Sequence, residues 1–266
     1  MGNPSEPVSS ENRRHAWIRA GTLGAIAGIG CHVSAIGYRC IELHRAPFAT
    51  AGESLSLLAV LLVAAYLVAD RLWRIPAAGT FALGIGFLLV LFAGMQPSTE
   101  VGAHPLLEEN AISLHILAIL SAFAAFALAF TVAVLYLIER RILRRKDGLA
   151  WRRRLPPLGL LERASFALVA FGFPLLSLGI LSGIVRAAGG GMGPGWLLDP
   201  KTILALVLWG VYGTFLVSRL VLRWTPQRSA WILVAGLLLC GCVLGVPTAT
   251  HRFPVTSEGA RPRSGG

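Results

Sequence analysis

Two histidines are the residues of this sequence whose type and context suggest metal chemistry. His115 lies in the run Ser113-Leu-His-Ile-Leu, and His251 lies in Thr248-Ala-Thr-His-Arg-Phe. Neutral imidazole is a good ligand for transition metals and for haem iron. Taken alone, each histidine can also be read as a polar residue at a membrane interface. The pair gains meaning only if the fold brings both residues to one place.

A glycine-rich segment from Gly189 to Lys201 is a second candidate. It is too long and too rich in glycine to be a simple turn, and its glycines allow the backbone to lie close to a flat ligand. The segment ends in Asp199-Pro200, which predicts Asp199 as the N-cap and Pro200 as the first residue of a helix. Capping is therefore an alternative to a ligand-binding role for Asp199.

The cysteines show no spacing typical of zinc or redox sites. Cys31, Cys40, Cys240 and Cys242 lie in or beside apolar stretches and form no CxxC motif. Cys240 and Cys242 are two residues apart on a predicted helix and point in different directions. We predict that the four cysteines are packing residues.

Helical glycines and one further histidine lie within the first apolar stretch. His32 is an ionisable group inside a predicted membrane helix, so it is a site candidate; an interhelical hydrogen bond is the simpler interpretation. Small residues at a spacing of about one helical turn allow close approach to another helix, and we expect this of Gly21, Gly24, Gly28 and Gly30.

Composition excludes a water-soluble globule. Of the 266 residues 55% are hydrophobic and 14% are charged, which leaves too little polar surface to cover a soluble fold. A bilayer core needs about 20 apolar residues per helix. The sequence therefore predicts an all-α, polytopic membrane helix bundle of about seven transmembrane helices, near residues 16–36, 54–72, 77–96, 112–138, 164–186, 202–222 and 229–247.

The distribution of charge supports a membrane protein and argues against two other classes of function. The formal net charge of +11 arises from basic residues at helix ends, which indicates membrane topology and not nucleic-acid binding. Apart from His32, the interiors of the apolar stretches hold no Asp, Glu, Lys or Arg. Ion-coupled transporters usually need such groups, so a small-solute transporter is disfavoured.

The distribution of Lys and Arg predicts the orientation. Residues 139–154 are strongly basic and should be cytoplasmic, whereas residues 96–110 contain three Glu and no basic residue and should face outward. Arg39 and Arg45 fit less well, because their loop is predicted outside. We expect a cytoplasmic N-terminal tail (1–15), a transmembrane domain (16–250) and an extracytoplasmic C-terminal tail (251–266). The first helix resembles no cleavable signal peptide and is expected to be retained.

This topology brings the candidate residues to the same side of the membrane. His115 opens the fourth stretch, the glycine-rich segment joins the fifth and sixth, and His251 follows the seventh. Two histidines on opposite sides of one outer cavity would be able to clamp a porphyrin. The sequence thus predicts that any chemistry takes place at the outer edge of the membrane.

At these residues the chain resembles the cytochrome c assembly family, the CcsA, CcmC and HemX type of membrane proteins that handle haem. The family's outer loop runs into W-x-W-D-P-K-E and then into a helix with a W-x-x-Y spacing. Trp196-Leu-Leu-Asp-Pro-Lys-Thr202 matches most of this motif, and Trp209 and Tyr212 follow. The resemblance covers about residues 16–255 and includes the segments 47–55, 113–123, 139–158 and 171–183.

The resemblance implies roles for particular residues. In such proteins the loop holds haem at the outer face and two outer histidines supply its axial ligands. By position these are His115 and His251, with Trp196 and Asp199 in the loop. The motif's second tryptophan is Leu198 here and its glutamate is Thr202, which makes the chain more similar to the HemX-like members. Many relatives have one further N-terminal helix.

The resemblance therefore implies a protein of the inner (cytoplasmic) membrane that binds haem b transiently and presents it to apocytochrome c. We assign no catalytic residue, and the chain is expected to act at most as a subunit of a haem-attachment (synthase) system. A CcsB-like protein or another assembly subunit is the expected partner, because the chain offers no dithiol of its own. The alternative is a HemX-like regulatory or scaffolding membrane protein without haem chemistry.

Overall fold

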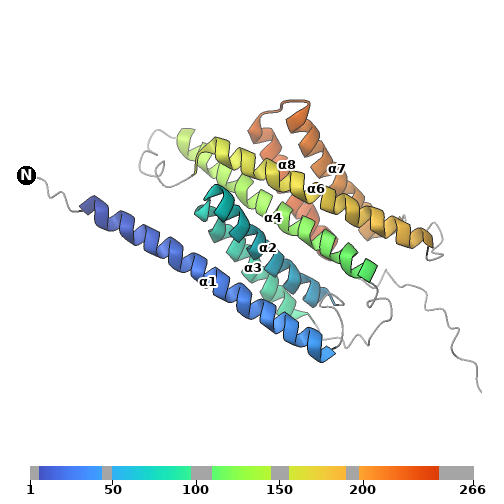
Figure 1. The fold of residues 1–266 in the computed structure, drawn as a ribbon. Coiled ribbons are helices and arrows are strands. Elements are labelled where there is room, and N and C mark those ends of the chain that lie inside the picture. The colour runs from blue at the N-terminus through green and yellow to red at the C-terminus, as the bar shows by residue number, and fades with distance from the viewer. Residues whose placement is uncertain (1–5, 44–49, 97–109, 145–155, 190–197, 246–266) are drawn as a thin grey trace, which may run out of the picture.

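The fold is a bundle of long helices (Figure 1). The computed structural model describes residues 6–43, 50–96, 110–144, 156–189 and 198–245. The elements within these ranges are α1 (Glu6–Leu43), α2 (Ala51–Trp73), α3 (Pro76–Met95), α4 (Asn110–Arg144), α6 (Leu158–Gly189), α7 (Pro200–Leu220) and α8 (Pro226–Gly245).

Seven of the described helices are long and apolar enough to cross a membrane, which confirms the predicted all-α class and the expected number of spans. The chain is a multi-pass membrane protein. Several helices are longer than their apolar stretches: α1 begins at Glu6, α4 continues to Arg144 and α6 begins at Leu158. Backbone hydrogen bonds continue into the polar flanks, where water and headgroups solvate the charged side chains.

Successive helices run antiparallel, and tight connections at two places are visible in the backbone. After α2, Arg74 adopts a left-handed conformation (φ 51°) and its N–H donates to the carbonyl of Asp70 at 2.8 Å; Pro76 then begins α3. Between α7 and α8, Arg223 has φ 48°. The starts of α4 and α7 and the ends of α6 and α8 thereby lie at one end of the bundle. We call it the histidine end because it contains His115.

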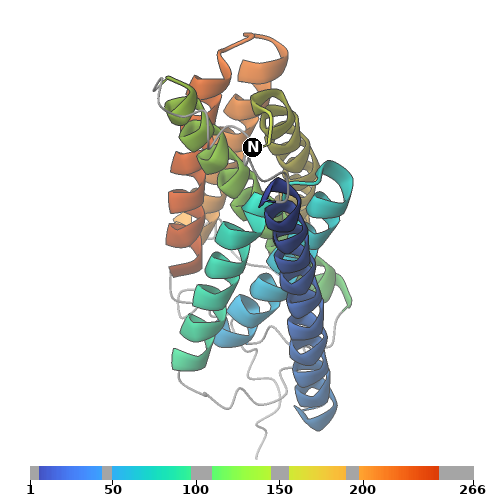
Figure 2. The ribbon, with the colours of Figure 1, turned by 90° about the vertical axis from the view of Figure 1, so that its left-hand side faces the viewer.

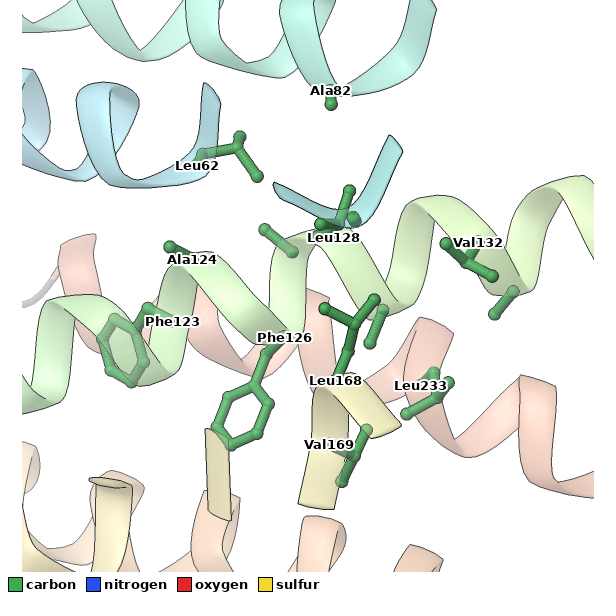
Figure 3. Packing of buried hydrophobic residues seen from close by; sticks show 14 of the residues in the cluster. Leu62, Ala82, Phe123, Ala124, Phe126, Leu128, Val132, Leu168, Val169 and Leu233 are labelled. Atoms are coloured by element: carbon green, nitrogen blue, oxygen red, sulfur yellow. The ribbon is translucent and has the colours of Figure 1, made fainter. Parts of the chain in front are cut away.

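Helix α4 is the centre of the bundle. In its most apolar window 67% of the residues are buried, compared with 6% for α1. Helices α2, α3, α6 and α8 all contact it, and Figure 2 shows α1 at the periphery. Figure 3 shows Leu128 and Val132 of α4 among side chains from the surrounding helices. A helix that is apolar all round is typical of such a central position.

The closest approach to α4 is made by α6 along a line of glycines. We call Gly172, Gly179 and Gly183 the glycine seam. Each lies against a side chain of α4. Equal steps along the two antiparallel helices separate the pairs Gly183 and His115, Gly179 and Ile119, Gly172 and Phe126. Small residues that admit a neighbouring side chain are the usual basis of tight helix packing in membranes.

Helix α7 joins this core through aromatic side chains. Tyr212 is fully buried, and its ring stacks on Phe126 with ring centroids 3.6 Å apart. Gly236 of α8 makes room for the same ring, since a Cβ there would lie 2.9 Å from the Tyr212 hydroxyl oxygen. Tyr212 thus fills the core where α4, α7 and α8 meet.

The opposite end, which we call the arginine end, contains buried polar groups. Arg219 of α7 forms an ion pair with Glu162 of α6. Beside it is a cavity of about 10 Å³, lined in part by Tyr136, Ser165 and Ser229, which is large enough for about one water molecule. Polar residues of the described chain therefore gather at helix ends, as expected if the middle of the bundle lies in hydrocarbon.

The prediction for the glycines of α1 is wrong within the described chain. A Cβ at Gly21, Gly24, Gly28 or Gly30 would have no described atom within 4 Å beyond its own helix. Helix α1 packs mainly on α2. The same residue type at similar spacing does bring helices together in α6, because there a partner helix supplies side chains to fill the space.

We predict that Gly172→Ala destabilises the protein by about 1–3 kcal/mol, because the added methyl would lie 2.7 Å from the ring of Phe126 and overpack the core. Thermal unfolding of the detergent-solubilised protein measures the effect. Gly210→Ala is the matched control, since its Cβ would meet nothing within 4 Å. Equal unfolding temperatures for the two variants would contradict the role of the glycine seam.

Candidate functional site

His115 lies in the second turn of α4, half-buried between α4 and α6. Its imidazole rests against Gly183 of α6: a Cβ built there would lie 3.1 Å from Cε1 of the ring. A side chain at this position would be crowded against the imidazole, which would have to move by a few tenths of an ångström. The backbone of α6 thus forms one wall of the histidine position.

A hydrogen bond fixes the imidazole within its plane. Nδ1 of His115 lies 2.9 Å from Oγ of Ser182. The same Oγ donates to the carbonyl oxygen of Gly179 at 2.9 Å. His115 is therefore connected to the helix backbone of α6 through one hydroxyl group, and the direction of its ring is set by α6 and not by α4 alone.

Asp199 caps α7, as predicted. Its carboxylate accepts a hydrogen bond from the backbone N–H of Lys201 at 2.8 Å, and Pro200 is the first helical residue. A carboxylate at a helix start also interacts favourably with the helix dipole. The expected cap is confirmed.

Asp199 and His115 lie at the same end of the bundle. Trp209 of α7 meets Ser177 of α6, so depths along the two antiparallel helices can be compared. Asp199 is about 15 Å along α7 from Trp209, and Ser182 is roughly 7.5 Å along α6 from Ser177, at 1.5 Å per residue. The Ser182 position, and with it His115, therefore lies between the Trp209 contact and the end of the bundle at which α7 starts.

Two predicted site residues, His251 and Trp196, lie outside the described residues. Helix α8 ends at Gly245 at the histidine end, and His251 follows shortly afterwards in the sequence. Trp196 precedes Leu198, which is 77% exposed. The described residues contain no group of three His, Cys, Asp or Glu side chains that would hold a metal ion.

The two aromatic residues that follow the loop motif have structural positions. The indole N–H of Trp209 donates to Oγ of Ser177 at 2.9 Å, and the ring stacks on Phe173 with centroids 5.4 Å apart. Tyr212, one turn later, is in the core. These residues attach α7 to α6 and α4, and so they hold the cap at Asp199 in place relative to His115.

His32 makes the interhelical hydrogen bond that we preferred over ligation. Its Nε2 lies 2.8 Å from Oγ of Ser56 in α2. Of the cysteines, Cys240 is buried while Cys31 and Cys242 are exposed, and all four are free thiols. Cys240 therefore packs in the core, as predicted, and Cys40 is half-buried. Cys31 and Cys242 are exposed within the described chain, which corrects the prediction for these two residues.

Sequence reasoning missed Ser182 and Gly183, which hold His115. No local pattern marks a serine that bonds a histidine on another helix. A signal for Gly183 was present, because Gly172, Gly179 and Gly183 fall on one face of a helix at spacings of seven and four residues. That pattern is typical of a close helix contact, although it does not indicate the partner residue.

Comparison with known proteins agrees with the resemblance. The sequence is 26% identical to the cytochrome c biogenesis protein CcsA of Guillardia theta over 231 residues, which is 79% of this chain and 76% of that protein. It is 28% identical to the CcsA protein of Synechococcus sp. (strain RCC307), covering 79% of this chain and 75% of the relative. It is also 28% identical to the protein HemX of Brevibacillus brevis, covering 77% and 75%.

The model of the family described as cytochrome C assembly protein matches residues 48–248. The match spans α2 to α8 and includes His115, the glycine seam and the cap at Asp199, while α1 lies entirely before it. The chain belongs to the cytochrome c assembly protein family.

Proposed function

We propose that this protein binds haem b at the extracytoplasmic face of the membrane and presents it for attachment to apocytochrome c. Membership of the family supports a role in cytochrome c assembly, and relatives named CcsA are described as cytochrome c biogenesis proteins. In this proposal His115 and His251 are the axial ligands, and Trp196 packs against the edge of the porphyrin.

The observation that carries the proposal is the fixed imidazole of His115 at the histidine end. An axial ligand must present one ring nitrogen in a defined direction while the other is held by a hydrogen bond. His115 meets this requirement, since Nδ1 is bonded to Ser182 and the ring lies against Gly183. The residues present therefore fit the ligand role, with Nε2 as the nitrogen that would bind iron.

The other residues support binding in different ways. The cap at Asp199 sets the end of the loop that contains Trp196, and Lys201 is half-buried beside it. Lys201, together with Arg252 outside the described residues, would pair with the haem propionates. Haem, when bound, supplies the vinyl groups to which the cysteine thiols of apocytochrome c add.

The chain's thiols do not form a reducing pair. Cys31 and Cys40 lie on α1, whereas Cys240 and Cys242 lie on α8. Thioether formation needs reduced cysteines on the apocytochrome, so a CcsB-like protein or another assembly subunit would have to supply the reducing step. In this proposal the protein acts by holding and positioning haem, as a subunit of a synthase system.

A second candidate is a HemX-like regulatory or scaffolding role without haem chemistry. The similarity to the HemX protein of Brevibacillus brevis favours it, as do Leu198 and Thr202 at positions where the loop motif has tryptophan and glutamate. The exposed side chain of Leu198 lies beside the cap of α7, where an aromatic residue would add surface for a porphyrin.

We predict that the detergent-purified protein, mixed with ferric haem b, shows a Soret band typical of a six-coordinate low-spin iron. His115→Ala and His251→Ala should each remove one ligand, change the spin state and weaken binding, and the double variant should lose the band. Added imidazole should restore the low-spin spectrum of each single variant.

His44→Ala is the control. This histidine matches neither ligand position of the family, so its replacement should leave the spectrum unchanged. A wild-type protein that gives no Soret band above free haem would favour the scaffolding role. Loss of apocytochrome c maturation in cells with the double variant, at unchanged protein level, would add a functional measure.

A separate prediction concerns Asp199. Asp199→Ala should lower stability by about 0.5–2 kcal/mol, because α7 loses its N-cap acceptor. Asp199→Asn and Asp199→Ser keep an acceptor and should restore both stability and haem retention if the residue only fixes the loop. Thermal unfolding and the Soret absorbance measure the two effects; normal stability with lost haem in Asp199→Asn would instead show that the charge itself is needed.

The proposed orientation, in the inner (cytoplasmic) membrane with the N-terminus inside, is open to a direct check. Alkaline phosphatase, which is active only outside the cytoplasm of bacteria, should be active when fused after Gly266 and inactive when fused after Lys146. The reverse pattern would place the histidine end in the cytoplasm and would exclude delivery to an extracytoplasmic apocytochrome.

A further inference from the structure

The hydroxyl group of Ser182 lies between Nδ1 of His115 and the carbonyl oxygen of Gly179. A serine hydroxyl has one hydrogen to donate, and here that hydrogen goes to the carbonyl of Gly179. With that hydrogen directed at Gly179, Oγ is left as an acceptor for Nδ1 of His115, which favours the tautomer protonated on Nδ1. That tautomer has its lone pair on Nε2.

The hydrogen bond to Ser182 disfavours an imidazole turned by 180°. Gly183 lies behind Cε1, and Nδ1 would be 3.8 Å and Nε2 4.0 Å from a Cβ at that position. A flipped ring would direct a carbon at Oγ of Ser182 and lose the hydrogen bond. α6 therefore supplies both a wall and a hydrogen-bond acceptor, from two adjacent residues.

We propose that Ser182 is a positioning residue that prepares His115 as an iron ligand. The inference rests on the proposed function. Ligating histidines commonly donate their second ring N–H to a carboxylate, carbonyl or water, which orients the ring and makes the ligand more basic. In this protein the hydroxyl group of Ser182 is the partner of the ring nitrogen, and it is itself hydrogen-bonded to the backbone of α6.

The same helix contains an internal control. Ser177 also donates to a backbone carbonyl, that of Phe173, and it also accepts from a side chain on another helix, the indole of Trp209. Ser177 and Ser182 therefore make equivalent hydrogen bonds, but only Ser182 contacts the histidine. A change specific to Ser182 separates ligand positioning from general packing of α6.

The test uses the full-length protein in detergent, titrated with ferric haem b. Ser182→Ala should raise the dissociation constant about tenfold to a hundredfold, in the range found for outer-shell partners of metal ligands. It should also shift the midpoint potential of the bound haem to more positive values, because a less basic histidine stabilises ferric iron less. Ser182→Thr keeps the hydroxyl and should retain the wild-type affinity and potential.

Three results would overturn the inference. One is a wild-type affinity and potential in Ser182→Ala; another is the same shift in Ser177→Ala; a third is failure of Ser182→Thr to restore the wild-type values. If Ser182→Ala does not fold, Ser182→Cys replaces it in the test, because cysteine has a similar volume but accepts hydrogen bonds weakly. Ser182→Cys should show the same loss of affinity and the same shift of the potential.

The proposed function fails independently of this inference. If His115→Ala binds haem with an unchanged spectrum, His115 is not a ligand and the proposed function loses its main support. If His115→Ala abolishes the low-spin spectrum while Ser182→Ala has no effect, haem binding stands and only the role of Ser182 is rejected.

Discussion

The close contact between α4 and α6 is the constraint on which the histidine end depends. In a bilayer, apolar side chains gain little by leaving lipid for a neighbouring helix, so tight packing and interhelical hydrogen bonds must hold helices together. The glycine seam provides the packing along this contact. Its last position, Gly183, is also the wall behind His115, so the contact that joins the two helices orients the candidate ligand as well.

The polar contacts differ between the arginine end and the surroundings of His115. At the arginine end, the pair of Glu162 and Arg219 joins α6 to α7 beside a small cavity. Around His115, a hydroxyl group and an imidazole make polar contacts that lead to the helix backbone. Hydrogen bonds of this kind satisfy polar atoms without charge, which suits a position beneath the membrane surface where unpaired charges are costly.

The site could be predicted from the sequence only in part. The loop motif and the helix signals placed Asp199 as a cap, and the structure agrees because capping depends on neighbouring residues. The alternation of basic loops predicted His115 and the end of α8 on one side, because the four spans α4, α6, α7 and α8 lie between them. Ser182 could not be found in this way, since its partner is 67 residues away in the chain. The glycines of α1 and α6 have similar spacing, yet only those of α6 meet another helix.

The amino-acid sequence alone was enough to establish the membrane class, the number of spans, the start of α7 and the family, because hydrophobic length, capping and motif spacing are local properties. The tertiary structure decided which helix lies at the centre, which glycines receive side chains and which hydroxyl holds His115. These depend on the rotation and depth of each helix relative to its neighbours, which the apolar pattern does not specify when lipid and protein interior are equally apolar.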